Sequence, residues 1–246
     1  MLQSEIQAFD FQKGEILVFD KPLDWTSFDL VHKVRYTICK KLNIKKLKVG
    51  HAGTLDPKAT GILILCTGNA TTRIETLQAG EKEYLATLKF GATTPSYDLE
   101  SSEDRQFDTT HISKELLMEV LKKFTGTIRQ VPPSYSAIKI EGKRAYEYAR
   151  KGIAVEIKHK TLEVKEIEVL NFSLPEVILR IVCGKGTYIR ALARDIGEAL
   201  SSGAYLTGLR RTRVGDYDLN QAIDLVDFLK AQPPIADIKQ ISNDIY

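Results

Sequence analysis

A single carboxylate in a glycine-rich stretch is the strongest candidate for chemistry in this sequence. Asp56 lies in VGHAGTLDPKATGILILCTG, residues 49–68, where glycines alternate with functional side chains such as His51. Glycines allow positive φ and let a ligand approach the backbone closely. Pro57 fixes its own φ and restricts Asp56 towards extended geometry. We therefore expect Asp56 on a stiff loop at the edge of a buried strand formed by Ile62–Cys66.

Other kinds of site fit the sequence less well. The stretch GKGTY is not a phosphate-binding loop, because Gly186 follows Lys185 where that motif needs Ser or Thr. His51 and Asp56 lack a second histidine or a carboxylate pair at ligand spacing, which argues against a metal site. No GxSxG elbow indicates a Ser-His-Asp hydrolase. What remains is one carboxylate, an arginine after a glycine-rich turn (Arg190) and several aromatic residues.

Charge is segregated along the 246 residues, although the net charge is only +3. Basic residues gather in 40–48, 139–160 and 210–213, and acidic residues gather around 98–108. This segregation predicts a surface that faces a polyanion, with ordinary solvated lysines as the alternative. The three cysteines are widely spaced, and neither a signal peptide nor a membrane-spanning apolar stretch is evident. We expect a reduced protein of the cytoplasm that does not enter a membrane.

The hydrophobic pattern predicts an α+β protein, because many strands are joined by short turns and interrupted by helices. The predicted strands are 15–20, 62–66, 81–91, 155–169, 176–183 and 204–214, and the predicted helices are 27–39, 70–77, 113–124, 189–200 and 220–230. We expect Ser27 to cap the first helix, with Phe28, Val31, Val34 and Ile38 facing inward. Residues 93–108 read as a polar, acidic loop.

Residues 126–160 differ in character from the rest of the chain. Pro132 and Pro133 interrupt regular structure, and bases such as Lys139 and Arg144 interleave with tyrosines while apolar core positions are sparse. This composition is typical of a segment that contacts RNA. The sequence therefore predicts an RNA-binding insertion here.

Several of these stretches together resemble the TruB family of tRNA pseudouridine synthases, across roughly residues 15–215. The matching motifs are Lys21-Pro22, GHAGTLDPKATG, Lys82-Glu83-Tyr84, PPSYSAIKIEGKRAYEYARK (132–151), GTYIR (186–190) and Leu209-Arg210-Arg211. The resemblance implies a pseudouridine synthase fold, with a central, mostly antiparallel mixed sheet flanked by helices. It also implies a catalytic domain over 1–230 whose insertion, 126–160, is a tRNA-binding thumb. Residues 231–246 would form a tail rather than a full PUA-type RNA-binding domain.

The resemblance further implies that the chain isomerises uridine 55 in the T arm of tRNA. The N1–C1′ bond breaks, the base rotates, and it rejoins through C5. No redox step or group donor is needed, so we expect no cofactor, no metal and a monomer acting on tRNA. The implied catalytic residues are Asp56, Arg190 and Tyr84: Arg190 keeps Asp56 ionised, and Tyr84 stacks on the base. His51 would fill the vacated position in the RNA stack. The implied substrate-binding residues are His51, Tyr188, Leu209, Lys21, Lys139 and Arg144.

Two alternatives and one mechanistic choice stay open at this point. Guide-RNA-dependent relatives share the catalytic motifs but lack the SAxKxxGxRAYxxAR segment, which favours the stand-alone enzyme. A non-catalytic tRNA-folding factor would need the same binding surface. Asp56 could attack C1′, attack C6 or abstract the 2′ proton.

Overall fold

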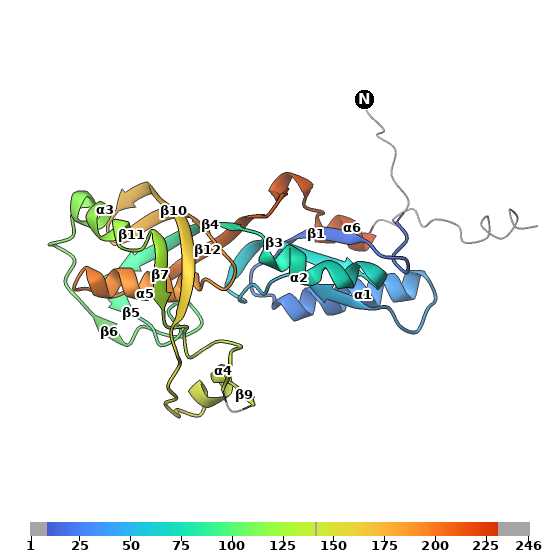
Figure 1. Ribbon diagram of the computed structural model, residues 1–246, viewed down its shortest axis with the longest axis horizontal. Coiled ribbons are helices and arrows are strands. Elements are labelled where there is room, and N and C mark those ends of the chain that lie inside the picture. Colours follow the sequence, from blue (N-terminus) through green and yellow to red (C-terminus); the bar gives the residue numbers. More distant parts are fainter. Residues whose placement is uncertain (1–8, 141, 231–246) are drawn as a thin grey trace, which may run out of the picture. The chain divides into compact units, whose positions relative to one another are not determined.

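The computed structural model describes residues 9–140 and 142–230, which form two compact units (Figure 1). Among the described residues, unit 1 comprises 9–78 and 217–230, and unit 2 comprises 79–140 and 142–216. Each unit combines antiparallel strands with helices, so the predicted α+β class is confirmed.

Unit 1 is built around β3 (Ala59–Thr67), which is buried along nearly its whole length. β1 (Ile16–Lys21) and β2 (Val49–His51) both pair with it in antiparallel register. The remaining elements of unit 1 are α1 (Ser27–Lys41), η1 (Gly68–Arg73), α2 (Ile74–Ala79), β13 (Tyr217–Asp218), η2 (Leu219–Gln221) and α6 (Leu225–Lys230). The helices predicted at 70–77 and 220–230 are therefore each divided between a 3-10 turn and a short α-helix.

An apolar core joins the two sequence-distant parts of unit 1. Phe228 of α6 packs edge-on against Phe19 of β1, with ring centroids 5.2 Å apart. α1 adds Leu30, Val34 and its other buried apolar residues to the same cluster.

The first helix differs from the sequence prediction in its register. Thr26, not Ser27, is the N-cap, and it forms a capping box with Asp29. Ser27 is instead buried, and Phe28, predicted to face inward, is 64% exposed. The prediction for Phe28 was wrong because the buried stripe follows Leu30 and its neighbours, so Phe28 falls outside it.

Unit 2 contains an antiparallel sheet in the order β12 (Ala204–Val214), β4 (Lys82–Phe90), β11 (Glu176–Cys183), β10 (Lys160–Ser173) and β7 (Gly126–Gln130). Alternate residues of β4 are buried, as its sequence pattern predicts. α5 (Ile189–Ala199) packs against β12 and β4, and α3 (Lys114–Lys122) packs against α5 and β10. The predicted strands 81–91, 176–183 and 204–214 are confirmed.

Three predictions for unit 2 need correction. The polar loop at 93–108 is partly ordered by pairing of β5 (Ala92–Thr93) with β6 (Arg105–Gln106). In the helix predicted at 113–124, whose apolar spacing places Leu116 with Leu117 and Val120 on the inward face, Leu116 is instead 39% exposed. The strand predicted at 155–169 is displaced to β10, whose pairing with β7 places both ends of the predicted insertion in the sheet.

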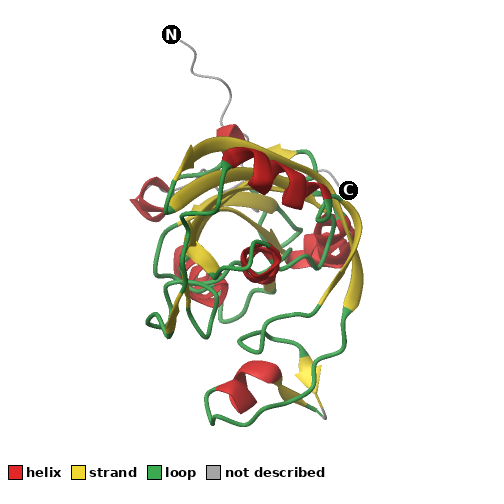
Figure 2. Ribbon diagram, turned by 90° about the vertical axis from the view of Figure 1, so that its left-hand side faces the viewer, coloured by secondary structure: helices red, strands yellow, loops and turns green. Residues whose placement is uncertain are grey.

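The segment outside the sheet is therefore 131–159, which we call the thumb segment. It contains β8 (Lys139–Ile140), β9 (Lys143–Arg144) and α4 (Ala145–Ala149). Figures 1 and 2 show α4 and its hairpin projecting from the ends of β7 and β10. The C-terminal tail, 231–246, lies outside the described residues.

Candidate active site

The loop that carries Asp56 is anchored to α1 by one buried hydroxyl. The Oγ of Ser27 donates a hydrogen bond to the carbonyl of Leu55 (3.0 Å) and accepts one from its N–H (2.8 Å). Asp56 follows directly and is half-buried, and its carbonyl accepts from the N–H of Ala59 at 3.1 Å. Both backbone groups of the residue before Asp56 are thus fixed from one point on the helix.

Lys21 supports the same loop from the end of β1. Its side chain is fully buried, and Nζ donates to the carbonyls of Pro22 (2.8 Å), Trp25 (2.6 Å) and Pro57 (3.4 Å). A buried ammonium group needs such acceptors to offset the loss of water. Lys21 was predicted to bind substrate, but the structure places it inside the protein as a support for Pro57. Contact between Lys21 and a substrate stays a prediction.

Two glycines of the motif stand where a larger residue would be strained or would clash. Gly53 has φ 105°, a conformation that favours glycine. A Cβ on Gly50 would lie 2.7 Å from Cδ1 of Ile74, so α2 packs closely on β2. His51 ends β2 opposite Leu65 of β3 and is half-buried. His51 and Asp56 therefore flank a short turn whose two ends are held by β2 and β3.

Arg190 lies in the first turn of α5 and is almost completely buried. Its Nη1 donates to the carbonyl of Ser96 (3.0 Å) and its Nη2 to the carbonyl of Tyr135 (2.9 Å). Its Nε is 3.5 Å from Oδ2 of Asp98, whose side chain is also buried. A guanidinium held in several directions presents its charge in a fixed orientation.

Asp98 is a residue that the sequence analysis missed. It was assigned to a polar, acidic loop, yet it is 4% exposed. Its Oδ1 accepts from the N–H of Glu100 (2.9 Å), and its carbonyl accepts from the hydroxyl of Thr94 (2.8 Å). No local pattern distinguishes it from the exposed acids nearby, because its cationic partner is distant in the chain.

Gln130 is a second missed residue, at the end of β7. Its side chain is fully buried, accepts a hydrogen bond from the N–H of Tyr188 (2.9 Å) and donates one to the carbonyl of Tyr188 (3.2 Å). Tyr188 occupies the N-cap position of α5, so Gln130 fixes the backbone at the start of that helix. Gln130, the last residue before the thumb segment, thus fixes the backbone of Tyr188, which was predicted to bind substrate.

Tyr84 and Leu209 lie on neighbouring strands of unit 2. Tyr84 is 8% exposed and pairs with Arg211 across β4 and β12, and Leu209 pairs with Ala86 in the same ladder. The structure thus brings these two predicted residues close together, as it does Tyr188 and Arg190 at the start of α5.

Lys82, two residues before Tyr84, is a buried amine with an altered pKa. Burial, followed by the nearby charge of Arg211, lowers the pKa of Lys82 to about 8. Nζ donates to the carbonyl of Gly80. Cys183, opposite Lys82 in the sheet, has its thiol pKa raised to about 11, mainly by burial.

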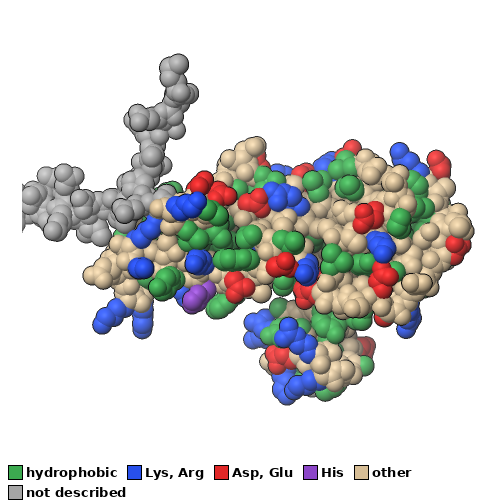
Figure 3. All heavy atoms as spheres, turned by 180° about the vertical axis from the view of Figure 1, so that it is seen from behind, with side chains coloured by type: hydrophobic (Ala, Val, Ile, Leu, Met, Phe, Trp, Pro, Cys, Tyr) green, Lys and Arg blue, Asp and Glu red, His purple; other side chains and the backbone are tan. Residues whose placement is uncertain are grey.

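The thumb segment presents cations to solvent. Lys139 and Arg144 pair with each other across the β8–β9 hairpin, and both are exposed. Nη1 of Arg144 donates to the carbonyl of Ala137 at 3.3 Å, which restrains the side chain near the hairpin. Figure 3 shows Lys and Arg side chains covering this projecting segment. The surface suits an anionic polymer.

Sequence comparison decides the family. The model described as TruB family pseudouridylate synthase (N terminal domain) matches residues 40–189, and that of the tRNA pseudouridylate synthase B C-terminal domain matches 190–238. A protein of Phocaeicola vulgatus named tRNA pseudouridine synthase B is 61% identical over 89% of this chain and 93% of its own length. The chain belongs to the TruB family. It is a pseudouridine synthase, an enzyme that isomerises uridine in RNA.

Further relatives agree with this assignment. A Bacteroides thetaiotaomicron protein of the same name is 58% identical over 96% of this chain and 98% of its own length. Among solved structures, a chain of a Cbf5-Nop10-Gar1 complex is 32% identical, with a TM-score of 0.67 over 89% of this chain. The chain spans 54% of that structure's chain. The predicted pseudouridine synthase fold is confirmed.

Two further findings concern the described part of the chain. Within residues 9–140 and 142–230, no group of three or more His, Cys, Asp or Glu side chains could hold a metal ion. The helices in these ranges are all too short or too polar to cross a lipid bilayer.

Proposed function

We propose that this enzyme converts uridine 55 in the T arm of tRNA to pseudouridine, in the cytoplasm, with Asp56 as its catalytic carboxylate. Relatives named tRNA pseudouridine synthase B, which match nearly the whole chain, support tRNA as the substrate. The observation that best supports a catalytic role for Asp56 is the way its loop is held in place. Ser27 and Lys21 fix the residues on either side of a carboxylate that stays half-exposed.

One carboxylate is enough for this isomerisation. Glycosidases use two, because the leaving group departs and water must be activated or a sugar–enzyme bond hydrolysed. Here the base stays in the pocket after the N1–C1′ bond breaks and rejoins the ribose through C5. The isomerisation needs no electron donor and no group donor, so we propose that the enzyme uses no cofactor. Asp56 acts as nucleophile or base on the ribose or the nucleobase.

Arg190 supplies the fixed positive charge of the mechanism. Its bonds to Ser96, Tyr135 and Asp98 prevent the guanidinium from turning away. The proposal requires Arg190 and Asp56 to act on the same nucleotide. Tyr84 stacks on the target base, and Tyr188 and Leu209 line the space around it.

The target uridine must leave the T loop before it can react. Extruding a base costs roughly a few kcal/mol, and stacking a base on an aromatic side chain returns about 1–3 kcal/mol. We assign His51 to the vacated position in the RNA stack. Lys139 and Arg144 of the thumb segment, with the lysines of 40–48, bind the phosphates.

Asp56→Asn tests the catalytic assignment. It should abolish pseudouridine formation in a T-arm transcript while the dissociation constant for the RNA stays within about twofold. Asp24→Asn is the matched control: Asp24 has φ 63°, which asparagine tolerates, and its carboxylate pairs with Lys58 near the surface. Turnover by Asp56→Asn, or loss of turnover in both variants, would remove Asp56 from its role.

The two alternative functions are separated by the same reaction. A guide-RNA-dependent synthase would leave a bare T-arm transcript unmodified unless a second RNA or protein were added. A tRNA-folding factor would keep its full cellular function in the Asp56→Asn variant. We expect modification of the bare transcript by the purified chain, with the thumb segment required for tight binding.

A further inference from the structure

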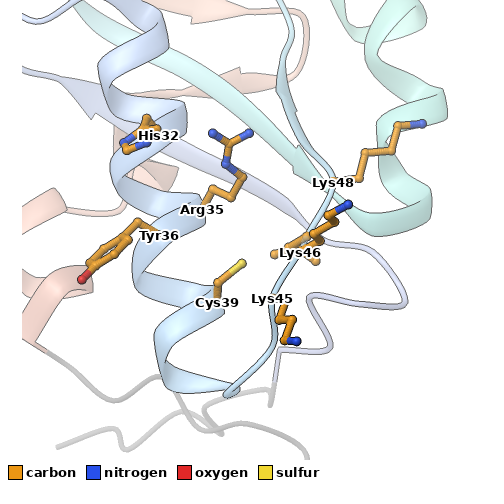
Figure 4. A pocket seen from close by; sticks show the side chains of 8 residues that line it. His32, Arg35, Tyr36, Cys39, Lys45, Lys46 and Lys48 are labelled. Carbon is orange, nitrogen blue, oxygen red and sulfur yellow. The ribbon is translucent and has the colours of Figure 1, made fainter.

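A hollow on unit 1 includes three of the lysines assigned above to the phosphates, but its other lining residues have no role in that mechanism. It has a volume of about 590 Å³ and lies between α1 and the segment that follows it. Its lining residues are His32, Arg35, Tyr36, Cys39 and Lys45–Lys48, which we call the α1 groove. The four α1 residues are spaced i, i+3, i+4 and i+7, so they share one face of the helix. In Figure 4, Arg35 and Cys39 point towards the lysine segment, and His32 and Tyr36 lie on the edge of this face that is farther from that segment.

Aromatic rings are exposed along this part of α1. Tyr36 is 59% exposed and Phe28 is 64% exposed. The rings of Phe28 and His32 are 6.5 Å apart between centroids and inclined by 34°. Unpaired nucleic acid bases stack on such rings whatever their sequence, because every base has a π-face. The groove therefore offers stacking surfaces that a folded core would normally bury.

The opposite wall of the α1 groove is strongly cationic. Among the described residues that line the groove, none is acidic. Within residues 9–140 and 142–230, Arg35, Lys45, Lys46 and Lys48 have no carboxylate partner. Figure 3 shows Lys and Arg side chains, with a histidine among them, gathered on unit 1. Unneutralised cations beside exposed rings are what an RNA backbone with unstacked bases requires.

The cationic wall continues beyond the groove. A second hollow of about 320 Å³ lies on the other side of the same segment, lined by Lys46, Leu47 and Lys48 together with Gln12, Gly68, Asn69, Thr71 and Thr72. Lys46 and Lys48 thus line both hollows, so the cations of this segment face two neighbouring depressions.

We propose that the α1 groove binds an unpaired RNA strand, with one or two bases stacked on Tyr36 and His32 and the phosphates on Arg35 and the three lysines. The ligand is a single-stranded part of the RNA substrate, and in this respect the inference rests on the proposed function. Binding here adds affinity for the substrate without contacting the reacting uridine.

Cys39 provides a local probe of the groove. It is the one partly exposed cysteine of the three, since Cys66 and Cys183 are buried. Burial also raises the pKa of both buried thiols, so alkylating reagents react with them slowly. The rate of modification of Cys39 by iodoacetamide therefore reports occupancy of the α1 groove, whereas RNA bound elsewhere on the chain leaves it unchanged.

The test measures this rate with a short oligoadenylate, which contains no uridine and cannot react. At an oligoadenylate concentration about ten times the dissociation constant, modification of Cys39 should slow roughly tenfold, as mass action requires. Tyr36→Ala should raise the oligoadenylate concentration needed for half-maximal protection about tenfold or more, and Tyr36→Phe should leave it unchanged. Neutralising Lys45, Lys46 and Lys48 to Gln should abolish it.

Controls separate this inference from its alternatives. Changing Lys114, Lys122 and Lys123 of unit 2 to Gln alters the charge equally and should leave protection intact. Asp56→Asn should also leave it intact, so failure of the catalytic proposal and failure of this one are distinguishable. With full-length tRNA, the groove variants should raise KM and leave kcat unchanged.

Salt dependence gives a quantitative check. Each phosphate neutralised on a single strand contributes about −0.7 to the slope of log K against log salt, so removing three lysines should make the slope less steep by about 2. The proposal is overturned if oligoadenylate leaves the Cys39 rate unchanged, if an RNA duplex protects as well as the single strand, or if only phosphatidylserine vesicles protect.

Discussion

The hydroxyl of Ser27 connects α1 to the residue that precedes Asp56, and Ser27→Ala tests how much the loop depends on it. The substitution removes the partner of both the N–H and the carbonyl of Leu55, in a region where Ser27 and Leu55 are 3% and 4% exposed. An unsatisfied buried polar group costs about 1–3 kcal/mol. With two such groups, the free energy of unfolding should fall by about 2–6 kcal/mol. For a chain of this size, each kcal/mol lowers Tm by about 2–4 °C, so Tm should fall by at least roughly 4 °C.

The catalytic effect should exceed what instability alone produces. A displacement of about 1 Å at a catalytic group can cost about a hundredfold in rate. We therefore expect kcat to fall about ten- to hundredfold at 20 °C, well below the Tm of the variant, with the dissociation constant for T-arm RNA unchanged. Because rejoining through C5 displaces the hydrogen of that carbon, release of tritium from 5-labelled uridine measures the reaction directly.

Thr110→Ala is the matched control, since its hydroxyl donates only to Asp108 at an exposed turn. It should change stability by less than about 0.5 kcal/mol and leave kcat unaltered. A Ser27→Ala protein with the wild-type Tm would refute the energetic argument. A lowered Tm with wild-type kcat would show that the anchor stabilises the fold without positioning Asp56.

Three other predictions address the charged groups. The folded-state pKa of Lys82 lies near 8, below its ordinary 10.5, so the unfolded chain binds more protons between these two pH values. The free energy of unfolding should therefore rise from pH 8 to pH 10.5. Urea titrations of the Lys82→Met variant should show this rise reduced by up to about 3 kcal/mol. Arg180 bridges three glutamates on neighbouring strands, and Arg180→Met should lower the free energy of unfolding by about 1 kcal/mol at low salt, with a smaller difference at 1 M salt. Arg190→Lys keeps the charge but loses the planar fork that bonds to two carbonyls, so kcat should fall at least about tenfold while RNA affinity persists; wild-type kinetics would contradict this.

The strands of unit 2 were predictable from sequence because their signals are local. β4 alternates buried and exposed residues along its length, and the apolar run of β11 is bounded by turns. The same holds for β3, whose apolar run predicted a strand buried on both faces. Such patterns depend only on neighbours in the chain.

Features that depend on distant partners were not predictable. Phe28 matched helical spacing, but the capping box of Thr26 and the packing of Leu30 placed it on the exposed side. Asp98 looked like its solvated acidic neighbours until Arg190 was brought to it by the fold. Lys21 was expected to bind substrate, yet its side chain is buried and donates hydrogen bonds to three backbone carbonyls.

The boundary of the thumb segment has a mechanical consequence. Gln130, where β7 ends, grips the backbone of Tyr188, and the carbonyl of Tyr135 accepts a hydrogen bond from Arg190. Both ties start in the root of the projecting arm and end within the first turn of α5. Under the proposed function, RNA bound to the projecting arm is therefore linked through these hydrogen bonds to the backbone of Tyr188 and to the guanidinium of Arg190.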